Sequence, residues 1–209
     1  MRLVNHLVTL EWVTPTPSIM VERAGRTCYK TEDRVGQNPA AEFLANIIRR
    51  GHESVLEHAV ASVRIITDKG ITHELVRHRI ASFSQESTRY CNYAGERFGG
   101  SVAFIRPVEL PVEAFEVWQE AMEAAERYYL RLLDMKVKPQ DARSVLPHAV
   151  KTEIVMTANL REWRHFLRLR HAKAAHPDMR VVAGQTYDLL LEHAGDFFPD
   201  FPKGGALCG

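Results

Sequence analysis

Residues 77–90 read Arg77-His78-Arg79-Ile80-Ala81-Ser82-Phe83-Ser84-Gln85-Glu86-Ser87-Thr88-Arg89-Tyr90. The stretch gathers three guanidinium groups, an imidazole and several hydroxyls beside two aromatic rings. Guanidinium groups are planar forks that match phosphate oxygens two at a time, and hydroxyls add further donors. Cations near a helix C-terminus are also mildly stabilising, which by itself would account for the triplet Arg77 to Arg79. The whole combination predicts an anion pocket with a place for a flat ring.

The residues before this stretch predict a strand, a turn and a helix. Residues 59–67 alternate, with apolar side chains on one face at Ala59, Ala61, Val63 and Ile65, which is typical of a half-buried strand. Asp68-Lys69-Gly70 indicates a turn. A helix is then expected to begin at Ile71, and the Arg-His-Arg triplet should fall near its last turn.

Other segments complete an α+β pattern. Further strands are expected at residues 2–13, 102–105 and 149–157. Helices are expected at residues 17–26, 39–51, 111–136, 139–147, 160–170 and 177–194, with Thr16, Asn38 and Asn159 as N-caps and Ser54 as the cap of one further turn. The long helix should bury Phe115, Trp118, Met122, Ala125, Tyr129 and Leu132 and expose its acids. Mixed order predicts a single α+β domain at 1–202, with a mixed or antiparallel sheet flanked by helices, and a flexible tail at 203–209.

Composition narrows the class of protein. A chain of 209 residues with 45% hydrophobic and 25% charged residues is typical of one soluble globular domain. A net charge of +1 argues against a nucleic-acid or membrane partner, although the segment from Arg143 to Arg180 is basic. Cys28, Cys91 and Cys208 form no paired motif, and neither a secretory leader nor a membrane-length apolar run is visible, so a cytoplasmic location is expected.

Arg170 stands out in the helix expected at 160–170. Trp163, Phe166 and Leu167 define the apolar row of that helix, and Arg170 is the next residue on the row. A guanidinium on a core-facing row needs an acceptor, because an unpaired buried charge is costly. The alternative is that its stem packs and its head reaches water. The opposite face carries Arg161, Arg164, His165 and Arg168, of which Arg164 and Arg168 are interpreted as exposed solubility charges.

The ordered set of motifs resembles the flavin-dependent thymidylate synthases. Arg77, His78 and Arg79, followed after seven residues by Ser87, match the signature of that family. Residues 51–58, Gly-His-Glu-Ser-Val-Leu-Glu-His, resemble its upstream segment, and residues 145–147, 159–161 and 166–170 resemble its C-terminal blocks in order and spacing. The similarity runs from about the first strand to the last helix.

The resemblance implies a function, ligands and site residues. It implies conversion of dUMP to dTMP with 5,10-methylenetetrahydrofolate as carbon donor, NADPH as reductant and FAD as cofactor, in a homotetramer with FAD sites at subunit interfaces. The implied dUMP residues are Glu74, Leu75, Val76, Arg77, Gln85, Glu86, Ser87, Thr88, Arg89, Arg143 and Arg170. The implied FAD residues are Ser54, Arg77, His78, Arg79, Gln85, Asn159, Leu160, Arg161 and His165. The implied catalytic residue is Arg170, which binds the uracil ring and favours its ionisation at N3.

Four positions depart from the common family pattern in charge. Gln85 stands where Glu is common, Glu74 where Gln is frequent, His165 where Asn is frequent, and His176 where Gln is frequent.

Two rival hypotheses remain. The first is an RNA-binding module that uses the basic C-terminal third with Tyr90, Tyr93 and Phe98 as stacking rings. The second is a metallohydrolase built on His52 and His58, but their spacing differs from His-Glu-x-x-His and no bound metal is expected.

Overall fold

A computed structural model describes residues 1–37, 39–91, 93, 95 and 99–202 of the chain. Three expectations lie outside these residues: the N-cap at Asn38, the stacking ring of Phe98, and the tail at 203–209 with Cys208. Among the described residues, no helix combines the length and apolar character needed to cross a bilayer.

The described chain divides into two compact units. Unit 1 comprises Met1–Leu7, Ile66–Arg77 and Ser84–Ile154, and unit 2 comprises Val8–Ile65, His78–Phe83 and the chain from Val155 onward. Each unit contains helices and strand residues, which confirms the expected α+β class.

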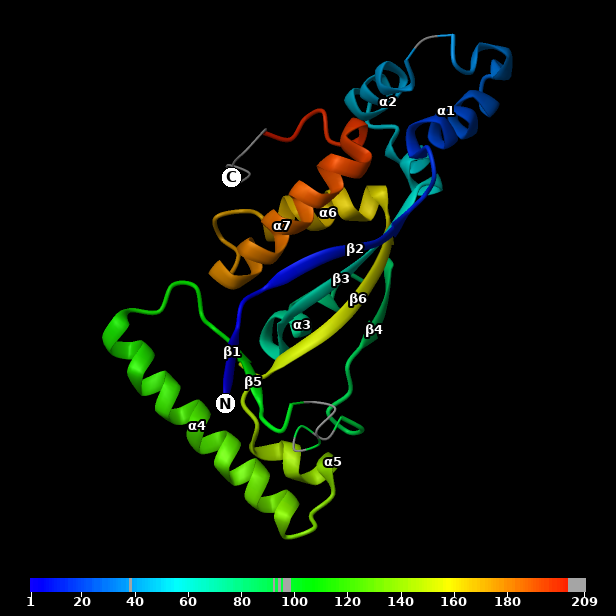
Figure 1. The fold of residues 1–209 in the computed structure, drawn as a ribbon. Helices are drawn as coiled ribbons and strands as arrows, with labels where there is room; N and C mark the ends of the chain where they lie inside the picture. The colour runs from blue at the N-terminus through cyan, green and yellow to red at the C-terminus, as the bar shows by residue number, and fades with distance from the viewer. Residues whose placement is uncertain (38, 92, 94, 96–98, 203–209) are drawn as a thin grey trace. The chain divides into compact units, whose positions relative to one another are not determined.

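The main sheet has four strands in the order β2-β3-β6-β4 (Figure 1). These strands are β2 (Leu7–Val13), β3 (Val60–Asp68), β6 (Lys151–Asn159) and β4 (Ala81–Gln85). In unit 2 the Thr14 amide, just past the end of β2, donates to the Val60 carbonyl at the start of β3. In unit 1 the His6 ring, just before β2, bonds the Thr67 hydroxyl near the end of β3. β2 and β3 are therefore antiparallel.

The expected first strand is in fact two strands. β1 (Arg2–Val4) pairs in parallel with β5 (Ala103–Ile105), and β2 begins only at Leu7. The chain leaves one sheet and joins the other between Val4 and Leu7, which alternation of apolar residues does not reveal. Of the other predicted strands, those at 59–67, 102–105 and 149–157 are confirmed as β3, β5 and β6 within two residues at each end.

The segment around the Arg-His-Arg triplet differs from the expectation. The helix there, α3 (Lys69–Leu75), starts two residues earlier because the Asp68 carboxylate accepts from the Ile71 amide at 2.8 Å. It ends at Leu75, so the triplet begins two positions later, near the last turn as expected but outside the helix. His78 turns into the interior of unit 2, where it is 4% exposed. The strand β4 that follows was not predicted, since Ala and Ser are weak strand formers.

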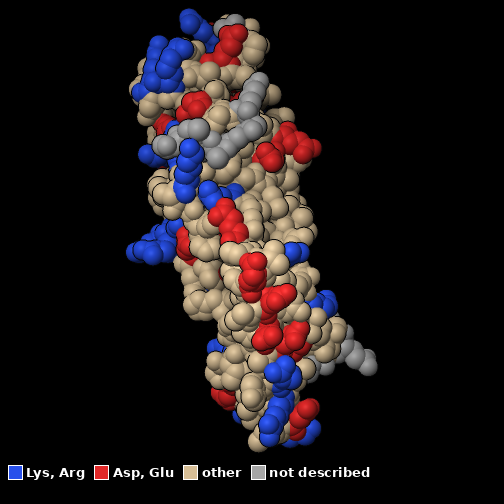
Figure 2. Space-filling view, turned by 90° about the vertical axis from the view of Figure 1, so that its left-hand side faces the viewer, with Lys and Arg blue, Asp and Glu red and all other residues tan. Residues whose placement is uncertain are grey.

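Unit 1 packs around the long helix α4 (Val112–Asp134). Its cluster of buried residues consists of Tyr93, Val102, Phe104, Met122, Tyr129, Ala142 and Val150. The predicted apolar face is confirmed at Met122 and Tyr129. Figure 2 shows acidic side chains gathered along the outer face of α4, as expected. Glu126 is the exception, because it is only 8% exposed. Its carboxylate accepts from the Val102 amide, just before β5, at 2.8 Å, and this backbone donor explains why the side chain is buried.

The remaining helices of unit 1 are short. α5 (Pro139–Ala142) continues into the 3-10 helix η4 (Arg143–Val145). Together they correspond to the helix predicted at residues 139–147.

Unit 2 holds most of the helices. They are α1 (Pro17–Thr27), η1 (Glu32–Arg34), α2 (Ala40–Arg49), η2 (Glu53–His58), α6 (Leu160–Arg170), α7 (Pro177–Ala194) and η5 (Gly195–Phe197). α2 ends before Gly51, whose φ of +72° is the left-handed conformation that favours glycine. α6 and α7 lie side by side (Figure 1). Thr16 is the N-cap residue of α1 as expected, although it is left-handed and its side chain makes no cap bond. Ser54 does not cap a turn as expected but lies inside η2.

The predicted cap of α6 is confirmed, because the Asn159 side chain accepts from the Glu162 amide at 2.8 Å. Asn159→Ala should lower the free energy of unfolding by about 1 kcal/mol, since this amide loses its acceptor. Asn159→Asp keeps an acceptor and adds a favourable charge at the helix N-terminus, so it should restore most of that stability. Urea denaturation of the three proteins measures the difference. Equal midpoints for Asn159→Ala and wild type would contradict a stabilising cap.

Candidate active site

Unit 1 contains a cavity of about 420 Å³, which we call the unit 1 cavity. It is lined by parts of α3, β4, η4 and the chain leading into β6, namely Lys69, His73, Gln85, Thr88, Arg143, Ser144, Leu146, Pro147, His148 and Val150. No acidic side chain is among these described lining residues. Two cations and several neutral donors, without a lining carboxylate, are suited to binding an anion.

Lys69 and Arg143 supply the positive charge of the unit 1 cavity. Burial lowers the pKa of Lys69, the Glu86 carboxylate raises it, and the nearby Arg143 lowers it further. The Lys69 Nζ donates to the Glu86 carbonyl at 3.1 Å. Arg143 donates through Nη1 to the Thr88 hydroxyl at 3.0 Å and through Nε to the Gln140 carbonyl at 3.1 Å. Both cations are therefore held in place by neutral oxygen atoms.

Tyr93 and Glu86 form a polar pair in unit 1. The Tyr93 hydroxyl donates to Glu86 Oε1 at 3.0 Å, and Lys151 Nζ lies 3.1 Å from Glu86 Oε2. Burial raises the pKa of Tyr93, and the charge of Glu86 raises it further. Because Tyr93 is only 6% exposed, the interpretation of its ring as an RNA-stacking platform is wrong.

Unit 2 contains a cavity at the N-terminus of α6, which we call the α6 cavity. Its volume is about 340 Å³, and it is lined by Glu53, Glu57, Ile80, Asn159, Arg161, Glu162, His165 and Arg168. Three of the predicted FAD residues, Asn159, Arg161 and His165, therefore share one cavity. Arg161 Nη1 lies 2.6 Å from Glu57 Oε1, and both side chains are exposed. The cavity lies at the N-terminus of α6, where the helix dipole favours negative charge.

A second cavity of unit 2, of about 650 Å³, is called the arginine cavity. It is lined by Gly25, Arg26, Cys28, Tyr29, Thr31, Arg34, Phe43, Asn46, Ile47, Arg50, His52, Ser54 and Val55. These described lining residues include three arginines and no acid. η2 contributes to both cavities of unit 2, because Glu53 and Glu57 line one and Ser54 lines the other.

His78, Glu162 and Arg170 form a chain of hydrogen bonds in unit 2. His78 Nδ1 lies 2.9 Å from Glu162 Oε1, and Arg170 Nε donates to His78 Nε2 at 3.1 Å. Burial lowers the pKa of His78; the bond to Glu162 raises it, while the charges of Arg170 and His165 lower it. Arg170 is half-buried, and the prediction that it needs an acceptor on the core-facing row is confirmed.

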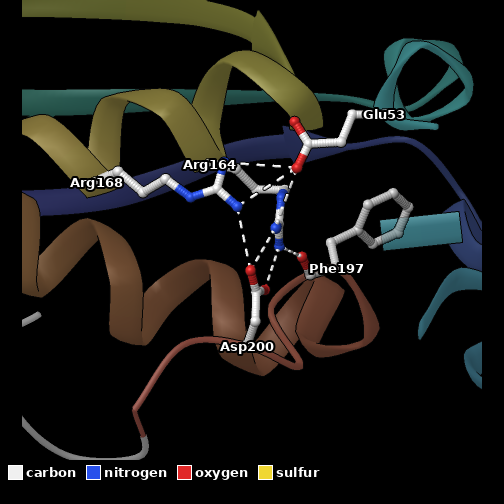
Figure 3. Close-up of polar contacts among 5 residues, drawn as sticks. All are labelled: Glu53, Arg164, Arg168, Phe197 and Asp200. Carbon is white, nitrogen blue, oxygen red and sulfur yellow. Dashed lines mark hydrogen bonds and ion pairs between the residues drawn. The ribbon is translucent and has the colours of Figure 1, made fainter. Parts of the chain in front are cut away.

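The prediction that Arg164 is an exposed solubility charge is wrong, because its side chain has no exposed surface. Figure 3 shows its guanidinium between Glu53, Asp200 and the Phe197 carbonyl. Its Nη1 and Nη2 each lie 2.8 Å from an Asp200 oxygen, and its Nη2 lies 3.4 Å from Glu53 Oε1. The C-terminal segment after α7 covers this face of α6, and a pattern within one helix does not show such a cover.

Arg168 and Phe201 extend this arrangement. Arg168 Nη2 lies 3.1 Å from Asp200 Oδ2 and 3.4 Å from Glu53 Oε1, although its side chain is 44% exposed. The Phe201 ring faces both guanidiniums, at 5.2 Å from Arg164 Cζ and 5.6 Å from Arg168 Cζ. We call these residues, Glu53, Arg164, Arg168, Asp200 and Phe201, the arginine clamp. Since Glu53 and Arg168 also line the α6 cavity, the clamp fixes part of its wall.

Comparison with known proteins agrees with the motifs. The family model described as thymidylate synthase complementing protein matches residues 9–194. A flavin-dependent thymidylate synthase of Geobacter sulfurreducens is 35% identical over 94% of this chain and 90% of its own length. One of Pyrococcus furiosus is 34% identical over 91% of this chain and 78% of its own length. The chain belongs to the flavin-dependent thymidylate synthase family.

A solved structure adds a likeness in fold. It is a UMP/dUMP methylase, PolB, from Streptomyces cacaoi, bound with 5-Br dUMP. The two chains share 25% identity with a TM-score of 0.78, over 92% of this chain and 93% of the other. An enzyme of the flavin-dependent thymidylate synthase kind is thus supported by sequence and by fold.

The residues matched to the family signature fall into both units. In unit 1, Gln85, Thr88 and Arg143 line the unit 1 cavity; the others matched there are Glu74, Leu75, Val76, Arg77, Glu86, Ser87 and Arg89. In unit 2 are Ser54, His78, Arg79, Asn159, Leu160, Arg161, His165 and Arg170. Their ligand assignments stay predictions. Sequence reasoning missed Lys69, His73 and His148 in one cavity and Arg26, Arg34 and Arg50 in another, because isolated basic residues carry no spacing signal.

The geometry explains one departure from the common family pattern. The Thr72 hydroxyl donates to the Lys69 carbonyl, so only its lone pairs remain for residue 85. The Gln85 amide nitrogen donates to Thr72 Oγ1 at 2.9 Å and lies 3.3 Å from Thr152 Oγ1. A glutamate carboxylate would offer no hydrogen to Thr72 in this arrangement, which accounts for the amide in this chain.

Asp200 provides a test of the arginine clamp. Asp200→Ala should lower the free energy of unfolding by about 1–3 kcal/mol, because the buried Arg164 guanidinium loses two acceptors. Asp196→Ala is a matched control in the same segment: its carboxylate accepts from Ser18 at an exposed site, so a change below about 0.5 kcal/mol is expected. Urea denaturation at neutral pH measures both, and equal losses in the two variants would contradict the clamp.

The clamp also predicts a pH dependence. Burial raises the pKa of Asp200, but hydrogen bonds and charge from Arg164 outweigh burial and lower it below its ordinary 3.8. The carboxylate therefore contributes stability above the ordinary pKa, and that contribution is lost as the pH falls through the lowered value. Stability of the wild type should fall more steeply below about pH 4 than stability of Asp200→Asn. Parallel curves would show that this carboxylate is not coupled to Arg164.

Proposed function

We propose that the protein converts dUMP to dTMP, with FAD as cofactor, 5,10-methylenetetrahydrofolate as carbon donor and NADPH as reductant. Family membership over residues 9–194 supports the reaction, and the acid-free unit 1 cavity is the observation that carries it, because it suits a nucleotide phosphate. The solved neighbour bound to a dUMP analogue supports dUMP as the substrate.

The nucleotide is proposed to use the residues that match the family signature, namely Arg77, Ser87, Arg89, Arg143 and Arg170. Arg143 and Thr88 already hold each other at 3.0 Å in the unit 1 cavity, which positions one guanidinium for a phosphate before substrate arrives. Arg170 is assigned to the uracil ring. A fixed cation beside the N3–H lowers the pKa of that group, and the anionic ring is a stronger carbon nucleophile at C5.

The residues of unit 2 fit a flavin dinucleotide. Arg34 and Arg50 of the arginine cavity, with Ser54 and no lining acid among the described residues, suit a pyrophosphate. The third arginine, Arg26, is paired with Glu22. The α6 cavity, with Asn159, Arg161 and His165 at a helix N-terminus, suits a further polar part of the cofactor. Reduced flavin supplies the hydride that completes the methyl group. We also propose a cytoplasmic homotetramer, with flavin sites that draw residues from more than one subunit.

The visible spectrum of the purified protein tests the flavin assignment. FAD is added, unbound FAD is removed by gel filtration, and the spectrum is followed anaerobically with NADPH, with and without dUMP. Retained flavin that NADPH bleaches and dUMP perturbs is the expected result. A colourless protein whose spectrum ignores dUMP would overturn the flavin and nucleotide assignments together.

Arg170→Ala tests the nucleotide assignment. The variant should fold, retain flavin and lose roughly 10²–10³ in kcat for dTMP formation, as expected when a group that stabilises developing charge is removed. Arg64→Ala is a control for loss of an arginine, since Arg64 pairs with Glu11 at an exposed site, and its turnover should stay near wild type. Wild-type dTMP formation by Arg170→Ala would remove Arg170 from the mechanism.

A further inference from the structure

The side chain of His78 has a partner on each ring nitrogen, and both partners lie in unit 2. Glu162 Oε1 is 2.9 Å from Nδ1, and Arg170 Nε is 3.1 Å from Nε2. The ring is 4% exposed and meets the rings of Phe166 and His165 edge-on, at centroid distances of 5.2 and 5.7 Å. Packing and hydrogen bonds together leave the imidazole one orientation.

This arrangement decides which nitrogen of His78 carries the proton. A guanidinium only donates, so Nε2, which faces Arg170, must be the nitrogen with the lone pair. The proton of the neutral ring is then on Nδ1 and is donated to the Glu162 carboxylate. An imidazolium would set an N–H against the N–H of Arg170. The charged and titratable groups that face the ring are Glu162, Arg170 and His165. Burial and the interactions with Arg170 and His165 lower the pKa of His78 against the effect of Glu162, which favours the neutral ring.

We propose that Glu162 is a positioning residue for Arg170: it holds His78 in the Nδ1–H tautomer, and that tautomer keeps an acceptor facing the Arg170 guanidinium. The bond to His78 takes the Nε hydrogen, so the direction of the two Nη groups follows the orientation of the imidazole. Glu162 is itself held, since its amide donates to Asn159 at the N-terminus of α6. The catalytic consequence rests on the proposed function of Arg170, whereas the tautomer does not.

A metal site is the other use of the same residues. His78, Glu162 and His165 carry ligand atoms within 4.8 Å of one another. Both nitrogens of His78 already have partners, however, and one partner is a guanidinium that would repel a cation. The hydrogen-bonded chain therefore explains the cluster better than a metal ion does.

Nitrogen NMR of the ¹⁵N-histidine-labelled protein, without flavin or nucleotide, tests the tautomer. The chain has ten histidines, so the His78 signals are assigned by their loss in His78→Gln. At neutral pH we expect Nδ1 protonated and Nε2 unprotonated in the wild type. Glu162→Gln should keep this pattern, because its amide oxygen still accepts, whereas Glu162→Ala should move the proton toward Nε2.

Glu22→Ala is the control for this measurement. Glu22 is another buried carboxylate of unit 2, paired with Arg26, so its loss should destabilise the protein without changing the His78 signals. An Nε2–H ring or an imidazolium in the wild type at neutral pH would overturn the proposal. A tautomer unchanged in Glu162→Ala would overturn it as well.

Kinetics of dTMP formation test the positioning role. Glu162→Ala should lower kcat by about tenfold or more through misplacement of Arg170, and Glu162→Gln should stay within about threefold of wild type. His78→Gln places a carbonyl oxygen near the Nε2 position and should retain more turnover than His78→Asn, whose amide reaches only the Nδ1 position. Wild-type kcat in Glu162→Ala, despite an altered tautomer, would overturn the positioning role.

The pH profile separates this role from a general loss of stability. The charge of Glu162 raises the pKa of His78, so Glu162→Gln should move the acid limb of kcat to lower pH. A limb that stays in place would overturn the coupling of Glu162 to turnover. If the wild type forms no dTMP at all, the proposed function fails, while the NMR result still decides the tautomer.

Discussion

The Arg164 guanidinium has no exposed surface, so its charge must be compensated inside unit 2. Asp200 supplies two oxygens, Glu53 a third and the Phe197 carbonyl a fourth. These partners come from η2 and from the segment after α7, and both are thereby tied to α6. α6 also carries Asn159 at its cap, Glu162 and Arg170, so the residues assigned to flavin and to uracil stand on a helix whose position the clamp determines.

Sequence reasoning was accurate where a local rule decides the structure. α6 and α7 have the predicted bounds, because Asn159 and Pro177 mark helix starts by mechanisms internal to the helix. Arg170 was found from the period of its own helix. Arg164 was missed on that same helix, because η2 and the C-terminal segment cover a face that the apolar row does not include. Periodicity reports one buried face and cannot show a second one made by polar partners.

Only part of the candidate site was predicted, because local sequence patterns do not show which separate residues the tertiary structure brings together. The signature residues were recognisable by their spacing, and three of them do line a cavity of unit 1. Other basic lining residues were not recognisable, since each is a single residue that only the tertiary structure brings to a cavity. They are Lys69 and His73 in the unit 1 cavity and the three arginines of the arginine cavity. β4 was missed because its ladder partner β6 lies far along the chain. The burial of Glu126 was missed because its backbone donor, the Val102 amide, lies outside α4 and 24 positions earlier in the chain.

The clamp also sets an order of events during synthesis of the chain. Asp200 follows Arg164 by 36 positions, so α6 leaves the ribosome before its main counter-charge exists. A cation that cannot be buried alone keeps that face of α6 open to water until the segment after α7 has emerged. The helix that carries the proposed chemistry is therefore among the last parts of unit 2 to reach its final packing. In a nascent chain arrested before Phe197, α6 would lack this final packing.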